Sequence, residues 1–251
     1  MFRPRYAIAL TALTAVGAGL MFFGTGGAFA PPDAGGEWTA WSVLFRHGSP
    51  VFLFTPLIIG FICGAGFAED SSTGYQWFIR IRMGSRIKSV SCKAVAILIS
   101  SFIGFFASFL LLAAIAFLLT DHSSPLPKNV VYFNEGLFLL HPYLYLVLLA
   151  GIAGLGASAM AGVACFASLW IKNPYAAGAA PIGYLFGSIA FESLLKVYYF
   201  NIFSALSLAD ARFNLQILTS IWLVHIIVLY GITVFLYEND KILPVLVLRG
   251  D

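Results

Sequence analysis

Long stretches without charge constrain this chain more than any other feature of its sequence. A helix needs about 20 apolar residues to cross a bilayer core about 30 Å thick. Six stretches meet this length, and only the fifth contains charges, Glu192 and Lys196 near its end. The stretches run approximately over residues 6–30, 50–68, 94–119, 144–171, 175–197 and 215–237. The sequence therefore predicts an all-α, multi-pass membrane protein in which residues 1–251 form one transmembrane domain with six transmembrane helices.

Composition excludes most other classes of protein. Hydrophobic residues make up 60% of the 251 residues and charged residues 10%, whereas soluble domains have about 45–50% and about 25%. Disordered chains and nucleic-acid-binding domains need more charge than this, and disulfide scaffolds need more than the three cysteines present. The cysteines and the four histidines show no metal-ligand spacing, so we expect no metal site.

The distribution of lysine and arginine predicts the orientation. Positive charge concentrates in short cytoplasmic segments, so we expect both termini in the cytoplasm and the chain in the inner (plasma) membrane. This orientation places ten of the 14 basic residues inside: Arg3, Arg5, Arg80, Arg82, Arg86, Lys88, Lys93, Lys172, Lys241 and Arg249. The first stretch ends in Ala28-Phe29-Ala30, which also resembles a signal-peptidase site. Its apolar run is longer than the roughly 7–15 residues of a signal core, which favours a retained helix over a cleaved signal.

Small residues recur every fourth position in two of the predicted helices. They are Ala150, Gly154, Ser158 and Gly162 in the fourth stretch, and Ala179, Gly183 and Gly187 in the fifth. Small residues at this spacing let helix backbones approach closely in lipid. Internal helix packing is the favoured interpretation, and a contact face for a second copy of the chain is the alternative.

The segment from Glu69 to Lys93 is the only long cytoplasmic segment that this orientation allows. It opens with two carboxylates, continues through a glycine and an aromatic run, and closes with basic residues. Its marked positions are Glu69, Asp70, Gly74, Tyr75, Trp77, Phe78, Arg82, Arg86 and Lys93. This pattern is compatible with a short amphipathic helix at the membrane surface. On composition alone, a basic loop whose aromatic side chains lie in the membrane interface is the favoured interpretation.

The spacing within this segment resembles the first cytoplasmic loop of ABC-2 type permeases, the membrane subunits of one class of ATP-binding-cassette exporters. In that family an acidic pair is followed four to five residues later by a glycine, then by Ser-Arg, and a lysine opens the third helix. Here Glu69 and Asp70 precede Gly74, Arg86 lies twelve residues beyond that glycine, and Lys93 lies seven beyond Arg86. Met83-Gly84 replaces the proline that commonly precedes Ser-Arg.

The resemblance implies that this segment is a coupling helix that docks on a separate P-loop ATPase. The chain contains no Gly-Lys dipeptide, so it has no phosphate loop of its own. It is therefore expected to be a non-catalytic subunit without cofactors, while ATP and magnesium bind the partner ATPase. Two permease chains, identical or related, would move an amphipathic substrate such as a peptide, antibiotic or similar natural product outward. The alternative is a secondary transporter that works without an ATPase, or a membrane assembly factor.

Three ionisable residues in apolar stretches are candidates for a transport pathway. Glu192 and Lys196 are spaced for a helical ion pair, which would lie near the lipid headgroups or at the outer mouth of the pathway. His225 lies midway along the sixth stretch, where a hydrogen-bonded core histidine is the more ordinary role. Ser158 together with His225 is also similar to the layout of rhomboid-type proteases, but the glycine that should follow the serine is absent.

Overall fold

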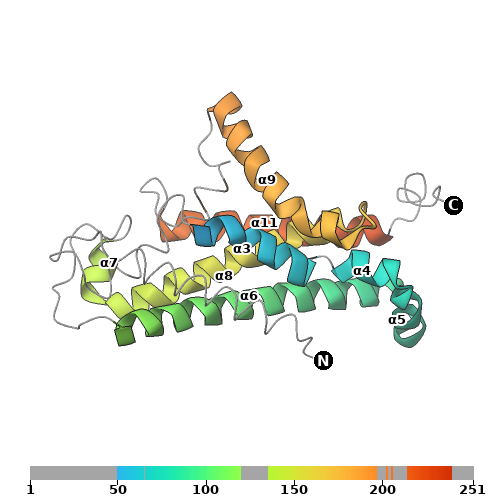
Figure 1. Cartoon of the computed structure of the whole chain (residues 1–251), viewed down its shortest axis with the longest axis horizontal. Coiled ribbons are helices and arrows are strands. Elements are labelled where there is room, and N and C mark those ends of the chain that lie inside the picture. The colour runs from blue at the N-terminus through green and yellow to red at the C-terminus, as the bar shows by residue number, and fades with distance from the viewer. Residues whose placement is uncertain are drawn as a thin grey trace. The chain divides into compact units, whose positions relative to one another are not determined.

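A computed structural model of the chain describes residues 50–64, 66–119, 135–196, 202, 205 and 214–238. Within these residues every regular element is a helix, as predicted. Figure 1 shows their arrangement along the chain. The elements are α3 (Pro50–Ile59), the π-helix η2 (Gly60–Gly64), α4 (Gly66–Ser72), α5 (Tyr75–Met83), α6 (Arg86–Leu119), α7 (Glu135–Leu140), α8 (Pro142–Ala167), α9 (Pro174–Leu195) and α11 (Leu215–Glu238).

Four of these helices are long and apolar enough to cross a membrane: α6, α8, α9 and α11. They correspond to the third, fourth, fifth and sixth predicted stretches, and they establish the membrane character of the chain. The first predicted helix, residues 6–30, lies outside the described residues. The second, residues 50–68, contains α3, η2 and the start of α4, and residue 65 lies outside the described residues. Within it, Gly60 opens the π-helix beside the backbone of Gly178, where any Cβ would overlap the carbonyl oxygen of that residue.

Polar residues set the ends of the long helices. Asn173 caps α9, since its side-chain oxygen accepts the N–H of Tyr175 at 2.9 Å and Pro174 fills the first helical position. Asn214 caps α11 in the same way, accepting the N–H of Ile217 at 2.7 Å. The fourth predicted helix extends to residue 171, whereas α8 ends at Ala167 and a turn follows.

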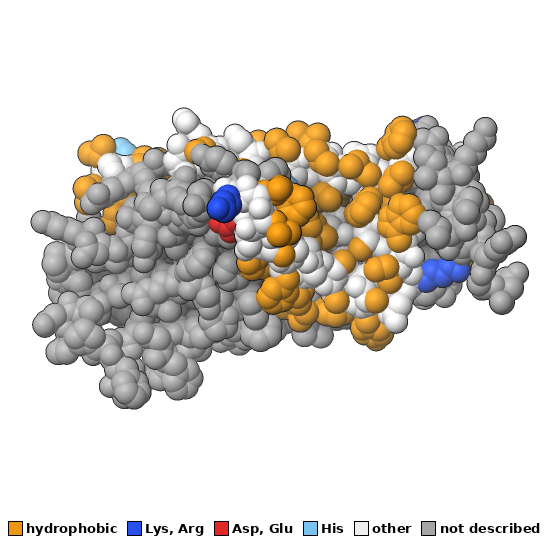
Figure 2. Space-filling view, turned by 90° about the horizontal axis from the view of Figure 1, so that it is seen from above, with side chains coloured by type: hydrophobic (Ala, Val, Ile, Leu, Met, Phe, Trp, Pro, Cys, Tyr) orange, Lys and Arg blue, Asp and Glu red, His pale blue; other side chains and the backbone are white. Residues whose placement is uncertain are grey.

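The outward faces of the helices are apolar, as lipid contact requires. Exposed side chains recur along α6 at Val95, Ile99, Ile103 and Leu111, while the opposite face is buried. Figure 2 shows hydrophobic side chains over much of the described surface on the side in view. Helix α8 is the most buried of the four: 78% of its most apolar 18-residue stretch is buried, against 33% or less for the same stretch of α6, α9 and α11. Its face of small residues therefore packs inside the protein.

The chain divides into two compact units, each made of three stretches. One contains residues 1–55, 103–154 and 185–220, and the other contains residues 56–102, 155–184 and 221–251. The second unit holds the end of α3, η2, α4, α5, the first half of α6, the second half of α8, the first part of α9 and most of α11. All contacts of the Glu69 to Lys93 segment described below lie within this unit.

Candidate functional site: the segment between α4 and α6

A glycine in the left-handed region ends α4. Gly74 has φ +70°, a conformation that favours glycine because it lacks Cβ. Thr73 completes the helix end: its N–H and its hydroxyl donate to the carbonyl of Glu69 at 3.0 and 2.9 Å. The glycine of the predicted motif is thus a helix stop, placed between the acidic pair and the aromatic run.

The following helix, α5, is short and exposed. Its nine residues include the predicted Tyr75, Trp77, Phe78 and Arg82. Phe78 and Ile81 are 68% and 77% exposed, which is unusual for large apolar side chains outside a lipid-facing helix, and Tyr75 is half exposed. Arg82 is exposed as well. A helix therefore occupies the place where the resemblance to the ABC-2 loop implied one, and its exposed side chains include both apolar and basic ones.

A second glycine ends α5. Gly84 has φ +63°, so Met83-Gly84 breaks the helix where a proline was expected from the resemblance. Ser85 then occupies the N-cap position of α6, and its carbonyl accepts the N–H of Ser89 at 3.2 Å. The Ser-Arg element is accordingly a helix start, with Arg86 the first residue of α6.

This start lies earlier than the apolar pattern predicted. We expected the third helix to begin at residue 94, directly after Lys93, because only from there is the sequence free of charge. In the structure α6 begins at Arg86, since helix geometry depends on the cap and on backbone hydrogen bonds rather than on hydrophobicity. Lys93 therefore lies in the third turn of α6 and does not open the helix.

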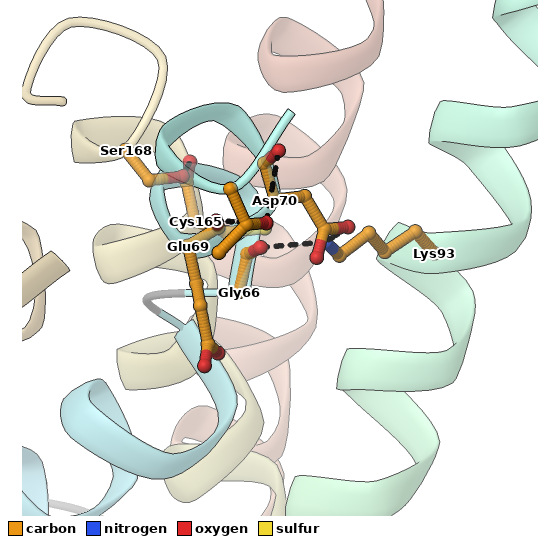
Figure 3. A network of polar contacts seen from close by, with 7 residues as sticks. Gly66, Glu69, Asp70, Lys93, Cys165 and Ser168 are labelled. Atoms are coloured by element: carbon orange, nitrogen blue, oxygen red, sulfur yellow. Dashed lines mark hydrogen bonds and ion pairs between the residues drawn. The ribbon is translucent and has the colours of Figure 1, made fainter. Parts of the chain in front are cut away.

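Lys93 is the centre of a network of polar contacts with α4 (Figure 3). Its Nζ forms an ion pair with Asp70 and donates to the carbonyl oxygen of Gly66 at 2.6 Å. The same ammonium lies 4.8 Å from the centre of the Phe67 ring, within the range of a cation–π interaction. The side chain of Asp70 is 6% exposed and that of Lys93 22%. The structure thus brings together two members of the predicted set, one from each end of the segment.

Sequence reasoning missed part of this network. Asp70 and Lys93 were both marked, but only as motif positions, and Gly66 and Phe67 were not marked at all. A pair separated by 23 residues has no local spacing rule, unlike an i, i+4 pair in one helix. The one signal available in the sequence was the opposite charge of the two residues near the ends of the Glu69 to Lys93 segment.

The two charged candidate pathway residues, Glu192 and Lys196, lie at the end of α9. Glu192 lies in the last turn of α9, but Lys196 is one residue beyond the helix, with φ +55°. The contact that joins them is a backbone hydrogen bond of 2.8 Å from the N–H of Lys196 to the carbonyl of Glu192. Lys196 therefore serves as a residue of the helix end, in the position that glycine commonly fills.

His225 is partly buried and its ring contacts its own helix and two aromatic residues. Its Nδ1 lies 2.8 Å from the carbonyl of Ile221. The centres of the Trp222 and Tyr184 rings lie 6.0 and 6.2 Å from the centre of the imidazole. These contacts fit a packed histidine of a transmembrane helix.

Ser158 is fully buried, and its hydrogen bonds join transmembrane helices. Its hydroxyl donates to the carbonyl of Leu98 at 3.1 Å and accepts from Ser101 at 3.3 Å. The hydroxyl of Tyr230 donates to the Ser158 carbonyl at 3.3 Å. Within the described part of the chain, no hydrogen bond joins Ser158 to His225. The geometry therefore gives the serine a packing role between α6, α8 and α11.

The two faces of small residues differ. In α8 all four members are buried, and the neighbouring helix α11 presses Tyr230 against Gly162, where a Cβ would lie 2.9 Å from the ring. In α9 Ala179, Gly183 and Gly187 are exposed. Internal packing accounts for the first face and not for the second.

Comparison with protein-family models, curated proteins and solved structures finds no match for this chain. Function is therefore inferred from the residues of the segment between α4 and α6 and from their contacts.

Proposed function

We propose that the chain is the membrane-spanning permease subunit of an ABC exporter, powered by a separate P-loop ATPase. The observation that carries this proposal is α5, a nine-residue exposed helix between two glycine stops. Large apolar side chains that neither the protein core nor a long membrane-crossing helix accounts for mark a protein or membrane contact site. The acidic pair, the Ser-Arg helix start and Lys93 stand around this helix at the spacing of the ABC-2 loop.

In the proposed topology six helices cross the inner membrane, with both termini and α5 in the cytoplasm. The described helices α6, α8, α9 and α11 are the third to sixth of these. ATP binding and hydrolysis on the partner would displace α5, and the displacement would move the transmembrane helices of two permease chains between inward-open and outward-open states. The cargo would be amphipathic, such as a peptide, an antibiotic or a similar natural product, because the helices carry few charges.

The exposed small-residue face of α9 supports a second permease chain as a partner. Gly183 and Gly187 have no atom within 4 Å of a Cβ position, so the face can receive a closely packed helix. In a background without the native cysteines, Gly183→Cys should form a disulfide-linked dimer on mild oxidation. Ile99→Cys, on the exposed face of α6, is the matched control and should remain monomeric. Equal cross-linking of the two variants would contradict a specific α9 contact.

A secondary transporter or an assembly factor is the alternative. A carrier driven by protons or sodium needs ionisable residues near the membrane midplane of several helices. Among the described helices His225 is the one candidate of this kind, and it is packed between aromatic rings.

Purification of the chain from its native membrane in mild detergent, followed by mass spectrometry, tests the proposal. We expect a P-loop ATPase at about one copy per permease chain. Arg86→Glu and Gly74→Pro, which alter the predicted coupling segment, should leave expression intact and abolish coupled ATP hydrolysis. Repeated recovery of the chain without an ATPase would overturn the proposal in favour of the alternative.

A further inference from the structure

Lys93 of α6 contacts the first part of α4. Among the described residues, its ammonium contacts the carboxylate of Asp70, the carbonyl of Gly66 and the ring of Phe67. Asp70 and Phe67 are 4% and 3% exposed, so the contact is an interior one. In Figure 3 the lysine side chain reaches from α6 across to α4, where these partners lie.

Fold stability alone is a weak explanation for such a contact. Removing two charges from water is costly, and apolar residues of similar volume are often as good or better for stability. A buried pair does, however, fix one geometry between two elements, because neither charge can slide away without losing its partner. The pair therefore determines how α4 lies on α6.

The position of this contact relative to α5 gives it a mechanical meaning. Gly74 follows Asp70 in the chain and Gly84 precedes Lys93, and both glycines have positive φ. Helix α5 thus lies between two glycines that end helices, while α4 and α6, the helices on either side of it in the chain, are held together by Lys93. A force on α5 reaches α6 through Ser85 at its start and through α4 at its third turn.

We infer that Lys93 is a positioning residue that locks α4 to α6, so that displacement of α5 moves α6 as a rigid lever. This inference rests on the proposed function, in which an ATPase displaces α5. It assigns to the Lys93 contact the transmission of movement, as distinct from binding of the ATPase, which the exposed side chains of α5 would provide.

The three partners of the lysine make the inference specific. The Gly66 carbonyl and the Phe67 ring both attract a cation and neither attracts a carboxylate. The reversed pair Asp70→Lys/Lys93→Asp keeps one positive and one negative charge but places a carboxylate beside these two groups. It should therefore fail to restore the lock, whereas Lys93→Arg, which retains a cation on α6, should preserve it.

Movement of α6 can be measured without knowing the cargo. Spin labels on Ile99→Cys in α6 and Ile227→Cys in α11 occupy exposed positions in the same compact unit. The complex with its co-purified ATPase is reconstituted in lipid vesicles, in a background in which the three native cysteines are replaced by alanine. The distance between the labels is compared without nucleotide and after trapping with Mg-ATP and vanadate, and ATP hydrolysis is followed by phosphate release.

We expect nucleotide trapping to shift the distance in the otherwise wild-type complex. The neutral double variant Asp70→Asn/Lys93→Met should retain the ATPase and its hydrolysis but lose the shift. Lys93→Arg should keep the shift, as should the matched control Lys172→Met, which removes an exposed lysine from the turn before α9. The reversed pair, a second variant that leaves no single buried charge behind, should lose it.

Three results would overturn the inference while the proposed function stands. The first is that the double variant keeps the shift in the distance between the labels, and the second is that the reversed pair shows it. The third is that the wild-type complex hydrolyses ATP with no shift at all. Failure to recover any ATPase with the wild-type chain would overturn both, and it would be seen before any variant is made.

Discussion

At the scale of single residues, the segment between α4 and α6 depends on two glycines and one buried charge. Gly74 and Gly84 adopt a backbone conformation that other residues enter only at a cost. The carboxylate of Asp70 is buried against the half-buried Lys93, so its charge is tolerated only because the ammonium is present. Substitutions at these positions should therefore have effects out of proportion to the size of the change.

Lys93→Met should destabilise the protein strongly, because it leaves the buried carboxylate of Asp70 without its cation. Breaking a buried pair from one side costs about 3–5 kcal/mol. The double variant Asp70→Asn/Lys93→Met removes the charge on both sides and should recover most of that loss. Thermal unfolding in detergent measures both, with Lys172→Met as the control for loss of one exposed lysine. Equal losses in the single and double variants would contradict the buried pair.

Gly74→Ala should fray the end of α4 by straining the backbone alone. No atom lies within 4 Å of the Cβ position, so the added methyl group meets no neighbour. The left-handed conformation costs an alanine about 1–2 kcal/mol. Gly74→Asn, a residue that tolerates this conformation, should be milder. Hydrogen exchange of the α4 amides distinguishes the variants, and equal protection in Gly74→Ala and wild type would contradict the assigned turn.

At the scale of elements, the close approach of η2 to α9 is the most demanding contact. A Cβ on Gly178 would lie 2.7 Å from Cδ1 of Phe61 and 3.1 Å from its Cα. The neighbour is partly backbone, so it cannot rotate away as a flexible side chain would. Two irregular elements meet here, since η2 is a π-helix and α9 contains Pro181.

Gly178→Ala should therefore destabilise the protein by about 1–3 kcal/mol, the usual cost of overpacking. Gly183→Ala is the matched control on the same helix, because its Cβ position is open. That variant should be neutral or slightly stabilising, since alanine favours the helix over glycine. The melting temperatures of the two variants in detergent give the comparison, and a loss in Gly183→Ala equal to that in Gly178→Ala would show that the η2 contact is not the cause.

At the scale of the whole molecule, the exposed apolar faces of the described helices are those of a membrane protein, and the small residues of α8 are buried. The proposed orientation places α5 in the cytoplasm and His141, which lies between α7 and α8, outside. Tyr75 of α5 and His141 are both exposed, so each position is suitable for labelling.

Cysteine labelling of intact cells tests this orientation. In a background without native cysteines, a membrane-impermeant maleimide should modify His141→Cys from outside. It should modify Tyr75→Cys only after the membrane is permeabilised. The reverse pattern would invert the topology and place the exposed helix α5 on the wrong side for a cytoplasmic ATPase.

The sequence by itself determined the class of the protein and the location of four membrane-crossing helices. The hydrophobicity of about 20 consecutive residues is a local property, so it can be recognised from the sequence without knowledge of the tertiary structure. The helix between Gly74 and Ser85 was predicted only from the resemblance of the segment to the ABC-2 loop, because composition alone favoured a loop. Helix ends were harder to recognise: the apolar pattern placed the start of α6 eight residues late, since caps rather than hydrophobicity begin a helix.

Only the tertiary structure decided which residues meet. It paired Lys93 with Asp70 and Gly66, set Gly60 against Gly178, and turned one small-residue face inward and the other outward. Each of these depends on contacts between residues far apart in the chain, for which sequence spacing carries no rule. It also placed the π-helix η2 inside the second predicted stretch, at a close backbone contact with α9.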